Sequence, residues 1–431
     1  MRVGSSSEWG LAILLLLIAV ACGSDEDGGE SATSGGASSS GGAGAGATGG
    51  GSTAGSGGSA AGSPGAGGAT ASSGGSAGPG GVGGGPSGVW SMGYYASWQA
   101  NDYPVSAIEW SGLTHVAMAF YMPDSDGSLE LLGGNPGVAA ALVDAAHANG
   151  VLAVASIGGA DSANAFRSAS AAGTLDAFVA NLVDLLDDPG YDGIDIDWEP
   201  LEVSDEATAI ELATRLRTAR ANVLLTIPVG YVNPNVPADV SGYAAIADAY
   251  DQLNIMSYGM AGAWQGWNSW HSSAIYQTNA ATPLSIDSTV NIYVDAGVPV
   301  SKLGLGIGGY GLCYSEPVTG PDQPLGGATI LASDGTMSYA NIMTRYYDES
   351  ARHWDSLARV PYLSFESPQA PDGCTYISYD DAESIAEKAA YLESRGLGGV
   401  ILWQINEAYL PGQAAGRRSP LLSALHDSLI E

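Results

Sequence analysis

Three acidic residues alternate with apolar ones in a short stretch near the middle of the chain. The stretch covers residues 192–199 and reads DGIDIDWE. Successive side chains of a β-strand point to opposite faces, so Asp195, Asp197 and Glu199 would share one face. Like charges this close together cannot all stay ionised, so at least one of these acids should hold its proton. A protonated acid beside an ionised carboxylate is the pair that cleavage of a glycosidic bond needs.

A metal site and a solvated acidic edge are the two alternatives for this stretch. Calcium loops also space their acids, but they favour Gly, Asn and a turn between the ligands. The intervening residues here are Ile194, Ile196 and Trp198, which favour burial. We therefore expect one buried face and one acidic face, with no metal. Asp192 has the opposite parity to the three acids, and we expect it to be structural.

The overall charge and the remaining reactive side chains exclude several functions. The chain has 13 Lys and Arg against 45 Asp and Glu, a net charge of −32. Such a surface repels phosphate backbones, so nucleic acid is not an expected partner, whereas a neutral or cationic polymer is. No histidine lies in a nucleophile-elbow context, and no Cys/His pair has zinc spacing, so no cofactor is expected. His271 follows a tryptophan in a loop, and we expect it at the surface.

The first 22 residues have the features of an export signal. Arg2 precedes an apolar run, residues 11–20, which is too short to span a membrane but suits a signal peptide. Small residues then lead to Cys22, as in bacterial lipoproteins, so we expect Cys22 to carry a lipid. Ala19 stands where such signals usually have Leu, and an ordinary secretory signal is the alternative. Either signal would export the protein, to a membrane anchor or to the extracellular space.

The next segment, residues 23–87, consists mostly of Gly, Ser and Ala. Such a sequence buries too little apolar surface to offset the entropy of ordering it, so we predict a disordered linker. We predict that residues 88–431 form the folded unit and that this unit is a monomer.

The folded unit alternates short apolar runs with helical patterns. The predicted strands are 92–95, 115–120, 152–157, 193–197, 223–228, 253–257, 303–307 and 399–403. The clearest helices are 136–149, 175–188, 205–220 and 381–395, which are rich in Ala and have apolar residues three or four apart. This alternation predicts an α/β fold, a (β/α)8 TIM barrel, whose chemistry would lie where the strands end. A doubly wound open sheet is the alternative, but no Gly-rich fingerprint follows the first strand.

The last two predicted strands are separated by more chain than one helix needs. Residues 312–376 contain turns, a short helix at 338–347 and further β-type runs, which predicts a small α+β insertion subdomain. Cys313 and Cys374 stand near its two ends. They could form a disulfide in an exported domain, and two unpaired thiols are the alternative.

The chain from Trp90 to Ala408 resembles glycoside hydrolase family 18, the chitinases and their relatives. Residues 192–199 match the family's DGxDxDxE signature in full. Four further segments resemble family elements in the same order: SIGG at 156–159, GYY at 93–95, MSY at 256–258 and the last strand through Trp403.

This resemblance implies roles for the acids. Glu199 would protonate the leaving glycosidic oxygen and later activate water. Asp197 would hold the N-acetyl group, whose own oxygen attacks the anomeric carbon, and Asp195 would share a proton with its neighbours. The resemblance implies a retaining, substrate-assisted chitinase that acts on N-acetylglucosamine polymers.

The resemblance also implies residues that bind the sugar. Tyr258 would bond the acetamido carbonyl, and Trp403 would lie under the sugar. Tyr94 and Ser156 would support the acids, and Trp98 and Trp264 would stack on further sugars. The roles of Trp267 and Trp270 stay open between sugar stacking and loop packing. One departure stands out, because the family commonly has Asp where this chain has Gly259, which removes a polar contact to the sugar.

Two other functions remain open. One is an endo-β-N-acetylglucosaminidase that acts on glycans or peptidoglycan. The other is a chitin-binding lectin without turnover, although lectins on this fold have usually lost the acid that corresponds to Glu199.

Overall fold

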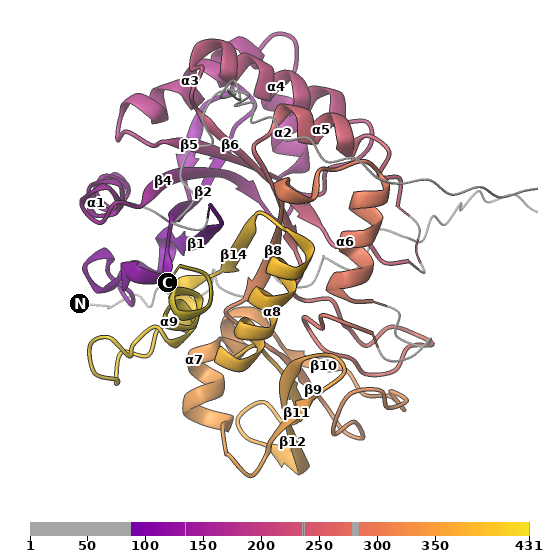
Figure 1. Ribbon diagram of the computed structural model, residues 1–431. Coiled ribbons are helices and arrows are strands. Elements are labelled where there is room, and N and C mark those ends of the chain that lie inside the picture. Colours follow the sequence, from indigo (N-terminus) through magenta and orange to yellow (C-terminus); the bar gives the residue numbers. More distant parts are fainter. Residues whose placement is uncertain (1–87, 134, 235, 237, 278–283, 431) are drawn as a thin grey trace, which may run out of the picture. The chain divides into compact units, whose positions relative to one another are not determined.

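The computed structural model describes residues 88–133, 135–234, 236, 238–277 and 284–430 (Figure 1). The predicted signal, Cys22 and the predicted linker lie outside the described residues. Within the described part of the chain, no helix combines the length and the apolar character that crossing a membrane requires.

Eight parallel strands form a closed barrel in the described part of the chain. They are β1 (Trp90–Ala96), β2 (His115–Pro123), β4 (Leu152–Gly159), β5 (Gly193–Trp198), β6 (Leu224–Gly230), β7 (Gln252–Met256), β8 (Leu303–Gly308) and β14 (Gly399–Trp403). The sheet runs β1-β14-β8-β7-β6-β5-β4-β2, and pairing of β1 with β2 closes it. The short β3 (Leu129–Leu131) pairs antiparallel with the end of β2. The predicted TIM barrel is confirmed, and each predicted strand overlaps one of these eight.

Helices surround the barrel because each buries one apolar stripe against the strands (Figure 1). They are α1 (Pro136–Ala148), α2 (Ala163–Ala169), α3 (Leu175–Asp187), α4 (Glu206–Ala219), α5 (Tyr243–Ala249), α6 (Ile286–Asp295), α8 (Ala382–Arg395) and α9 (Pro420–Leu425). In α4 the buried residues Ala209, Leu212, Ala213 and Leu216 follow the three-and-four spacing of one helix face. Helix α8 begins with a capping box between Asp381 and Ser384.

A five-stranded antiparallel sheet is inserted between β8 and β14. Its order is β10 (Ile330–Ala332), β9 (Leu312–Tyr314), β13 (Cys374–Ser378), β12 (Val360–Gln369) and β11 (Arg352–Asp355). The short helix α7 (Tyr339–Asn341) follows Ser338, whose side chain accepts a bond from the Asn341 N–H, and one π-helical turn continues it. A disulfide joins Cys313 to Cys374. The predicted insertion is confirmed, and Figure 1 shows it beside β8 and α8.

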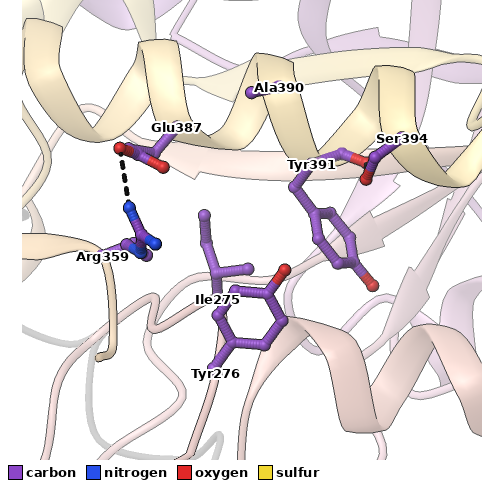
Figure 2. A pocket seen from close by; sticks show the side chains of 7 residues that line it. All are labelled: Ile275, Tyr276, Arg359, Glu387, Ala390, Tyr391 and Ser394. Atoms are coloured by element: carbon purple, nitrogen blue, oxygen red, sulfur yellow. Dashed lines mark hydrogen bonds and ion pairs between the residues drawn. The ribbon is translucent and has the colours of Figure 1, made fainter. Parts of the chain in front are cut away.

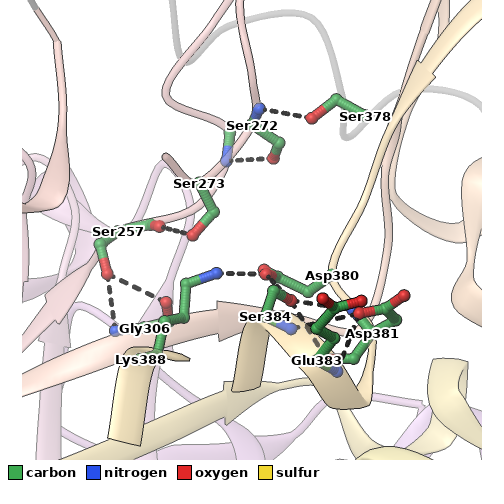
Figure 3. Close-up of polar contacts among 11 residues, drawn as sticks. Ser257, Ser272, Ser273, Gly306, Ser378, Asp380, Asp381, Glu383, Ser384 and Lys388 are labelled. Atoms are coloured by element: carbon green, nitrogen blue, oxygen red, sulfur yellow. Dashed lines mark hydrogen bonds and ion pairs between the residues drawn. The ribbon is translucent and has the colours of Figure 1, made fainter. Parts of the chain in front are cut away.

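Buried polar contacts join the loop after β7 to β7 and to the insertion, and helix α8 to the segment after β13 (Figure 3). The Ser272 N–H donates to Ser378 Oγ at 2.8 Å, and Ser273 Oγ donates to the carbonyl of Ser257 beside the end of β7. Lys388 of α8 forms a buried ion pair with Asp380, which follows β13. Each group is satisfied by a partner from another part of the chain, as buried polar groups require.

The prediction that His271 lies at the surface is wrong. His271 is fully buried, with Tyr376 Oη 3.0 Å from its Nδ1 and Asp355 Oδ2 3.1 Å from its Nε2. Both partners belong to the insertion, which covers this loop. Burial is therefore imposed by residues more than 80 positions later in the chain.

Candidate active site

The acidic strand β5 has the two faces that its alternation predicts. Ile194, Ile196 and Trp198 lie in the main hydrophobic core, where Trp198 stacks on Phe166 with ring centroids 4.7 Å apart. The side chains of even-numbered residues therefore point to the surrounding helices, and Asp195 and Asp197 point into the barrel, both buried. Glu199 directly follows the strand and is half-buried.

Three hydroxyl groups donate to the carboxylate of Asp195. Tyr94 and Ser156 bond Oδ2 at 3.0 and 2.7 Å, and Thr226 bonds Oδ1 at 2.5 Å. Burial raises the pKa of Asp195, and the three donated bonds oppose that shift because they favour the charged form. The structure thus brings Tyr94 and Ser156 to the acids, as expected for supporting residues.

Thr226 was not recognised from the sequence, although its position carries a signal. Ser156 on β4, Asp195 on β5 and Thr226 on β6 are register partners in neighbouring parallel strands. Their side chains therefore share one layer inside the barrel. Matching the parity of β6 to that of β5 would have identified Thr226.

Asp197 is buried with an unused hydrogen-bond acceptor. Its exposed fraction is 4%, and its Oδ1 has no partner among the described residues. Burial raises the pKa of Asp197 well above its ordinary value, and the charges of Glu199 and Asp195 raise it further. The side chain is therefore poised to share a proton and to accept a hydrogen bond from a bound group.

Glu199 has the properties of a general acid at neutral pH. Burial, with smaller contributions from the charges of Asp161 and Asp195, raises its pKa from 4.5 to about 7. Its backbone N–H donates to Ser162 Oγ at 3.0 Å, and Ser162 Oγ in turn donates to the carbonyl of Asp197. The loop after β4 thus fixes the end of the acidic strand, a contact that the sequence did not reveal.

The glycines of the SIGG segment allow β4 and β5 to approach each other. Gly158 has φ +103°, and a Cβ at this position would lie 2.3 Å from the carbonyl oxygen of Asp197. A side chain here would displace the strand that carries the acids. The segment therefore serves the site through its backbone as well as through Ser156.

Aromatic rings surround Trp403 at the end of β14. Tyr94 meets it edge-on at 5.6 Å, Phe120 stacks on it at 5.3 Å, and Trp98 lies 6.5 Å away between centroids. Trp98 is 41% exposed, so part of its face is open to a ligand. Phe120 was not among the predicted site residues.

Tyr258 completes the group beside the acids. Burial raises its pKa well above 10, with smaller contributions from Tyr310, Asp197 and Glu199. Its ring meets Tyr310 edge-on with centroids 6.0 Å apart. The phenol is therefore protonated at neutral pH and can donate a hydrogen bond.

The other predicted tryptophans differ in position. Trp264 is half-buried and meets Trp267 at 5.0 Å, and the ring contacts of the described residues do not join it to Trp403. Trp270 is buried and donates its indole N–H to the Leu284 carbonyl at 3.1 Å. Trp270 is therefore a core residue and cannot stack on a sugar.

The described residues outside the barrel mouth contain one surface pocket of note and no metal site. No group of three His, Cys, Asp or Glu side chains there is arranged to hold a metal ion. A surface pocket of about 160 Å³ lies between α8 and the segment around Tyr276, with the ion pair of Arg359 and Glu387 at its edge (Figure 2). This pocket contains none of the β5 acids.

Comparison with known proteins agrees with this geometry. Residues 91–408 match Glycosyl hydrolases family 18. The chain is 29% identical to a chitinase-like effector of Moniliophthora roreri over 72% of this chain and 87% of that protein. It is 31% identical to Chitinase A1 of Niallia circulans over 59% of this chain, but it spans only 40% of that protein.

The fold is also that of a solved chitinase. The Group IV chitinase of Ostrinia furnacalis matches with a TM-score of 0.68 at 22% identity, over 80% of this chain and all of that one. The family match covers most of the chain. The chain therefore belongs to glycosyl hydrolases family 18.

Proposed function

We propose that this protein hydrolyses β-1,4 bonds in N-acetylglucosamine polymers, with retention and with the substrate's acetamido group as the nucleophile. The observation that carries the proposal is the pairing of Asp197 and Glu199. Both are carboxyls with raised pKa values at the end of one strand, and Asp197 Oδ1 is buried and has no partner in the part of the chain that the structure describes. Two acids on one side of the sugar suit an internal nucleophile better than a second carboxylate opposite the first.

The first step breaks the glycosidic bond. Glu199 donates its proton to the leaving oxygen, and the acetamido carbonyl oxygen attacks the anomeric carbon from within the sugar. Asp197 accepts a hydrogen bond from the acetamido N–H, which orients the group and stabilises the positive charge that develops on it. The leaving sugar departs with the proton from Glu199.

The second step releases the product. Glu199, now ionised, takes a proton from water, and the hydroxide oxygen attacks the anomeric carbon and displaces the acetamido oxygen. Two inversions give net retention, so the first product is the β-anomer. A pKa of about 7 suits Glu199 to act as acid and as base in one cycle.

Neighbouring side chains set the pKa values of the two acids and position the sugar. A charge on Asp195, favoured by three donated hydrogen bonds, raises the pKa values of Asp197 and Glu199. Tyr258 donates to the acetamido carbonyl, and Trp403 stacks beneath the sugar.

Binding without turnover is the second candidate, because one relative is called a chitinase-like effector. The presence of Glu199 with its raised pKa favours hydrolysis. Glycans or peptidoglycan that contain N-acetylglucosamine are the alternative substrates within the same chemistry, which would make the protein an endo-β-N-acetylglucosaminidase.

The test is to mix the protein with N-acetylglucosamine hexamer and to follow the first minutes by NMR. We expect shorter oligomers whose new reducing ends are β, and no detectable products from Glu199→Gln within the same minutes. First products with α ends would contradict retention. Binding without products in the wild type would establish the second candidate, and a parallel reaction with peptidoglycan fragments covers the alternative substrate.

The proposal for location is separate and rests on the sequence alone. We propose that the protein is exported and that Cys22 anchors it through a lipid, with residues 23–87 as a tether. Cys22→Ala should abolish incorporation of radiolabelled palmitate and move the protein from the membrane fraction to the soluble fraction. Unchanged labelling in this variant would contradict the anchor.

A further inference from the structure

Two carboxyl groups outside β5 lie beside Trp403. Asp334 opens a short 3-10 helix of the insertion (Asp334–Met337), and Glu407 lies in the 3-10 helix that follows β14 (Ile405–Ala408). Burial raises the pKa of Asp334, and the nearby side chain of Trp403 opposes that shift. A Cβ on Gly335, the next residue, would lie 3.6 Å from Glu407 Oε1, so the two acidic segments are neighbours. Burial raises the pKa of Glu407 well above its ordinary value, and the charge of Asp334 raises it further. The insertion thus brings Asp334 to Glu407, near the ring that is expected to hold the sugar.

The backbone fixes this placement. The Tyr339 N–H donates to the Gly309 carbonyl at 2.7 Å, and the Gly311 N–H donates to the Met337 carbonyl at 2.9 Å. The Gly309 N–H itself donates to the carbonyl of Trp403 at 2.6 Å. The segment that carries Asp334 is therefore joined to the ends of both β8 and β14.

The pair has acceptors that the protein does not use. Glu407 is 4% exposed, and its Oε1 accepts from Gln404 Nε2 at 3.2 Å. Glu407 Oε2 and Gln404 Oε1 are buried and have no partner among the described residues. Neither Asp334 nor Glu407 takes part in an ion pair there. Buried acceptors without donors are costly.

Tyr310 is near both this pair and the catalytic acids. Burial raises its pKa, and the charges of Asp334 and Glu407 raise it further, with a smaller contribution from Glu199. Its hydroxyl lies 3.2 Å from the position that a Cβ on Gly259 would take. Absence of a side chain at position 259 thus leaves room for Tyr310 beside Tyr258.

We propose that Asp334, backed by Glu407 and Gln404, binds the protonated amine of a sugar residue next to the one that lies on Trp403. An ammonium group supplies both the hydrogen-bond donors and the positive charge that this acidic pair lacks. Asp197 needs an acetyl group on one sugar, and Asp334 needs a free amine on another. The substrate class is therefore an N-acetylglucosamine polymer that has lost part of its acetyl groups.

The charge of the whole chain agrees with this substrate. A net charge of −32 repels anionic glycans and attracts a cationic polymer at low ionic strength. Such steering acts on the rate of encounter, whereas Asp334 would act on affinity.

This inference rests on the proposed function, and the experiment separates the two. Two tetramers are compared by calorimetry in a Glu199→Gln background: one fully N-acetylated, the other carrying one free amine. Adding Asp334→Asn keeps an acceptor for Trp403 but removes the charge. We expect it to weaken binding of the amine-bearing tetramer at least about tenfold, and of the acetylated one less than about twofold.

Controls and a second variant keep the result interpretable. Glu366→Gln removes one exposed charge from the same insertion, and neither affinity should change with it. Glu407→Gln should reproduce the selective loss, to a smaller extent. Equal losses for the two tetramers, or no loss for either, would overturn the amine site. Failure of the wild type to cleave any N-acetylglucosamine polymer would instead overturn the proposed function.

Discussion

At the mouth of the barrel, Asp195, Asp197 and Glu199 lie close together, and no ion pair of the described residues includes them. Between the insertion and α8, buried Lys388 faces buried Asp380, which also accepts a bond from Ser384 Oγ at 2.7 Å. The barrel mouth therefore concentrates negative charge. At the contact between the insertion and α8, by contrast, a negative charge is paired with a positive one.

This difference separates groups kept for chemistry from groups kept for structure. Crowded acids with raised pKa values destabilise the fold at neutral pH, so they are explained by the reaction and not by stability. A paired buried charge gives little net stability, but removing one partner leaves the other uncompensated. Matched Asp or Glu substitutions in the two regions should therefore have opposite effects.

The largest effect should come from Glu199→Gln. Loss of the general acid and base should lower kcat by about 10²–10⁴-fold on short oligomers. The free energy of unfolding at pH 8 should rise by on the order of 1–3 kcal/mol, because a carboxyl whose folded pKa is about 7 loses stability as pH rises above its unfolded value. Urea unfolding measures the second effect, with Glu366→Gln as control. A less stable variant would place Glu199 among the structural charges.

Asp380→Asn should have the opposite effect on stability and should leave activity unchanged. It leaves Lys388 buried without its counter-ion, so the free energy of unfolding should fall by about 3 kcal/mol while kcat per folded molecule stays unchanged. Combining it with Lys388→Met should recover part of the loss, because both charges are then gone. No recovery in the double variant would show that the pair does not act as a unit.

The pH dependence of kcat/KM should reveal the interaction between the acids at the barrel mouth. The protonated form of Glu199 is lost as pH rises, so kcat/KM should decline above about pH 7. Asp195→Asn removes a charge that raises the pKa of Glu199, and the decline should move to lower pH. An unmoved profile would show that the two acids are not coupled.

A smaller effect should follow from Asp355→Asn in the insertion. Burial raises the pKa of Asp355, but bonds from His271 and from the Ala358 N–H outweigh burial and lower it to about 2. Loss of the charge should cost about 1–2 kcal/mol at pH 7. A carboxyl with a depressed folded pKa loses its contribution as pH falls, so the two proteins should converge between about pH 4 and pH 2. A difference that is constant with pH would contradict this.

The part of the site that lies on one strand could be predicted from the sequence. The alternation of residues 194–199 identified which acids face inward, because strand parity is a local property. Tyr94 and Ser156 were expected beside these acids through the family resemblance.

The contacts made by the insertion could not be predicted in this way. Asp334, Glu407 and buried His271 depend on how a distant antiparallel sheet packs against the barrel, which no local period encodes. Trp270 likewise looks like a loop residue in sequence and is buried because the insertion covers it. Tertiary packing decides such cases after local preferences have been satisfied.

The most direct test of the central claim is to titrate Glu199 itself. Infrared difference spectra of the wild type and Glu199→Gln, recorded from pH 4 to pH 9, isolate the carboxyl band of this one residue. We predict a protonated band that disappears with a midpoint near pH 7. A midpoint near its ordinary value of 4.5 would contradict the account, because Glu199 would then be ionised and unable to protonate the leaving oxygen.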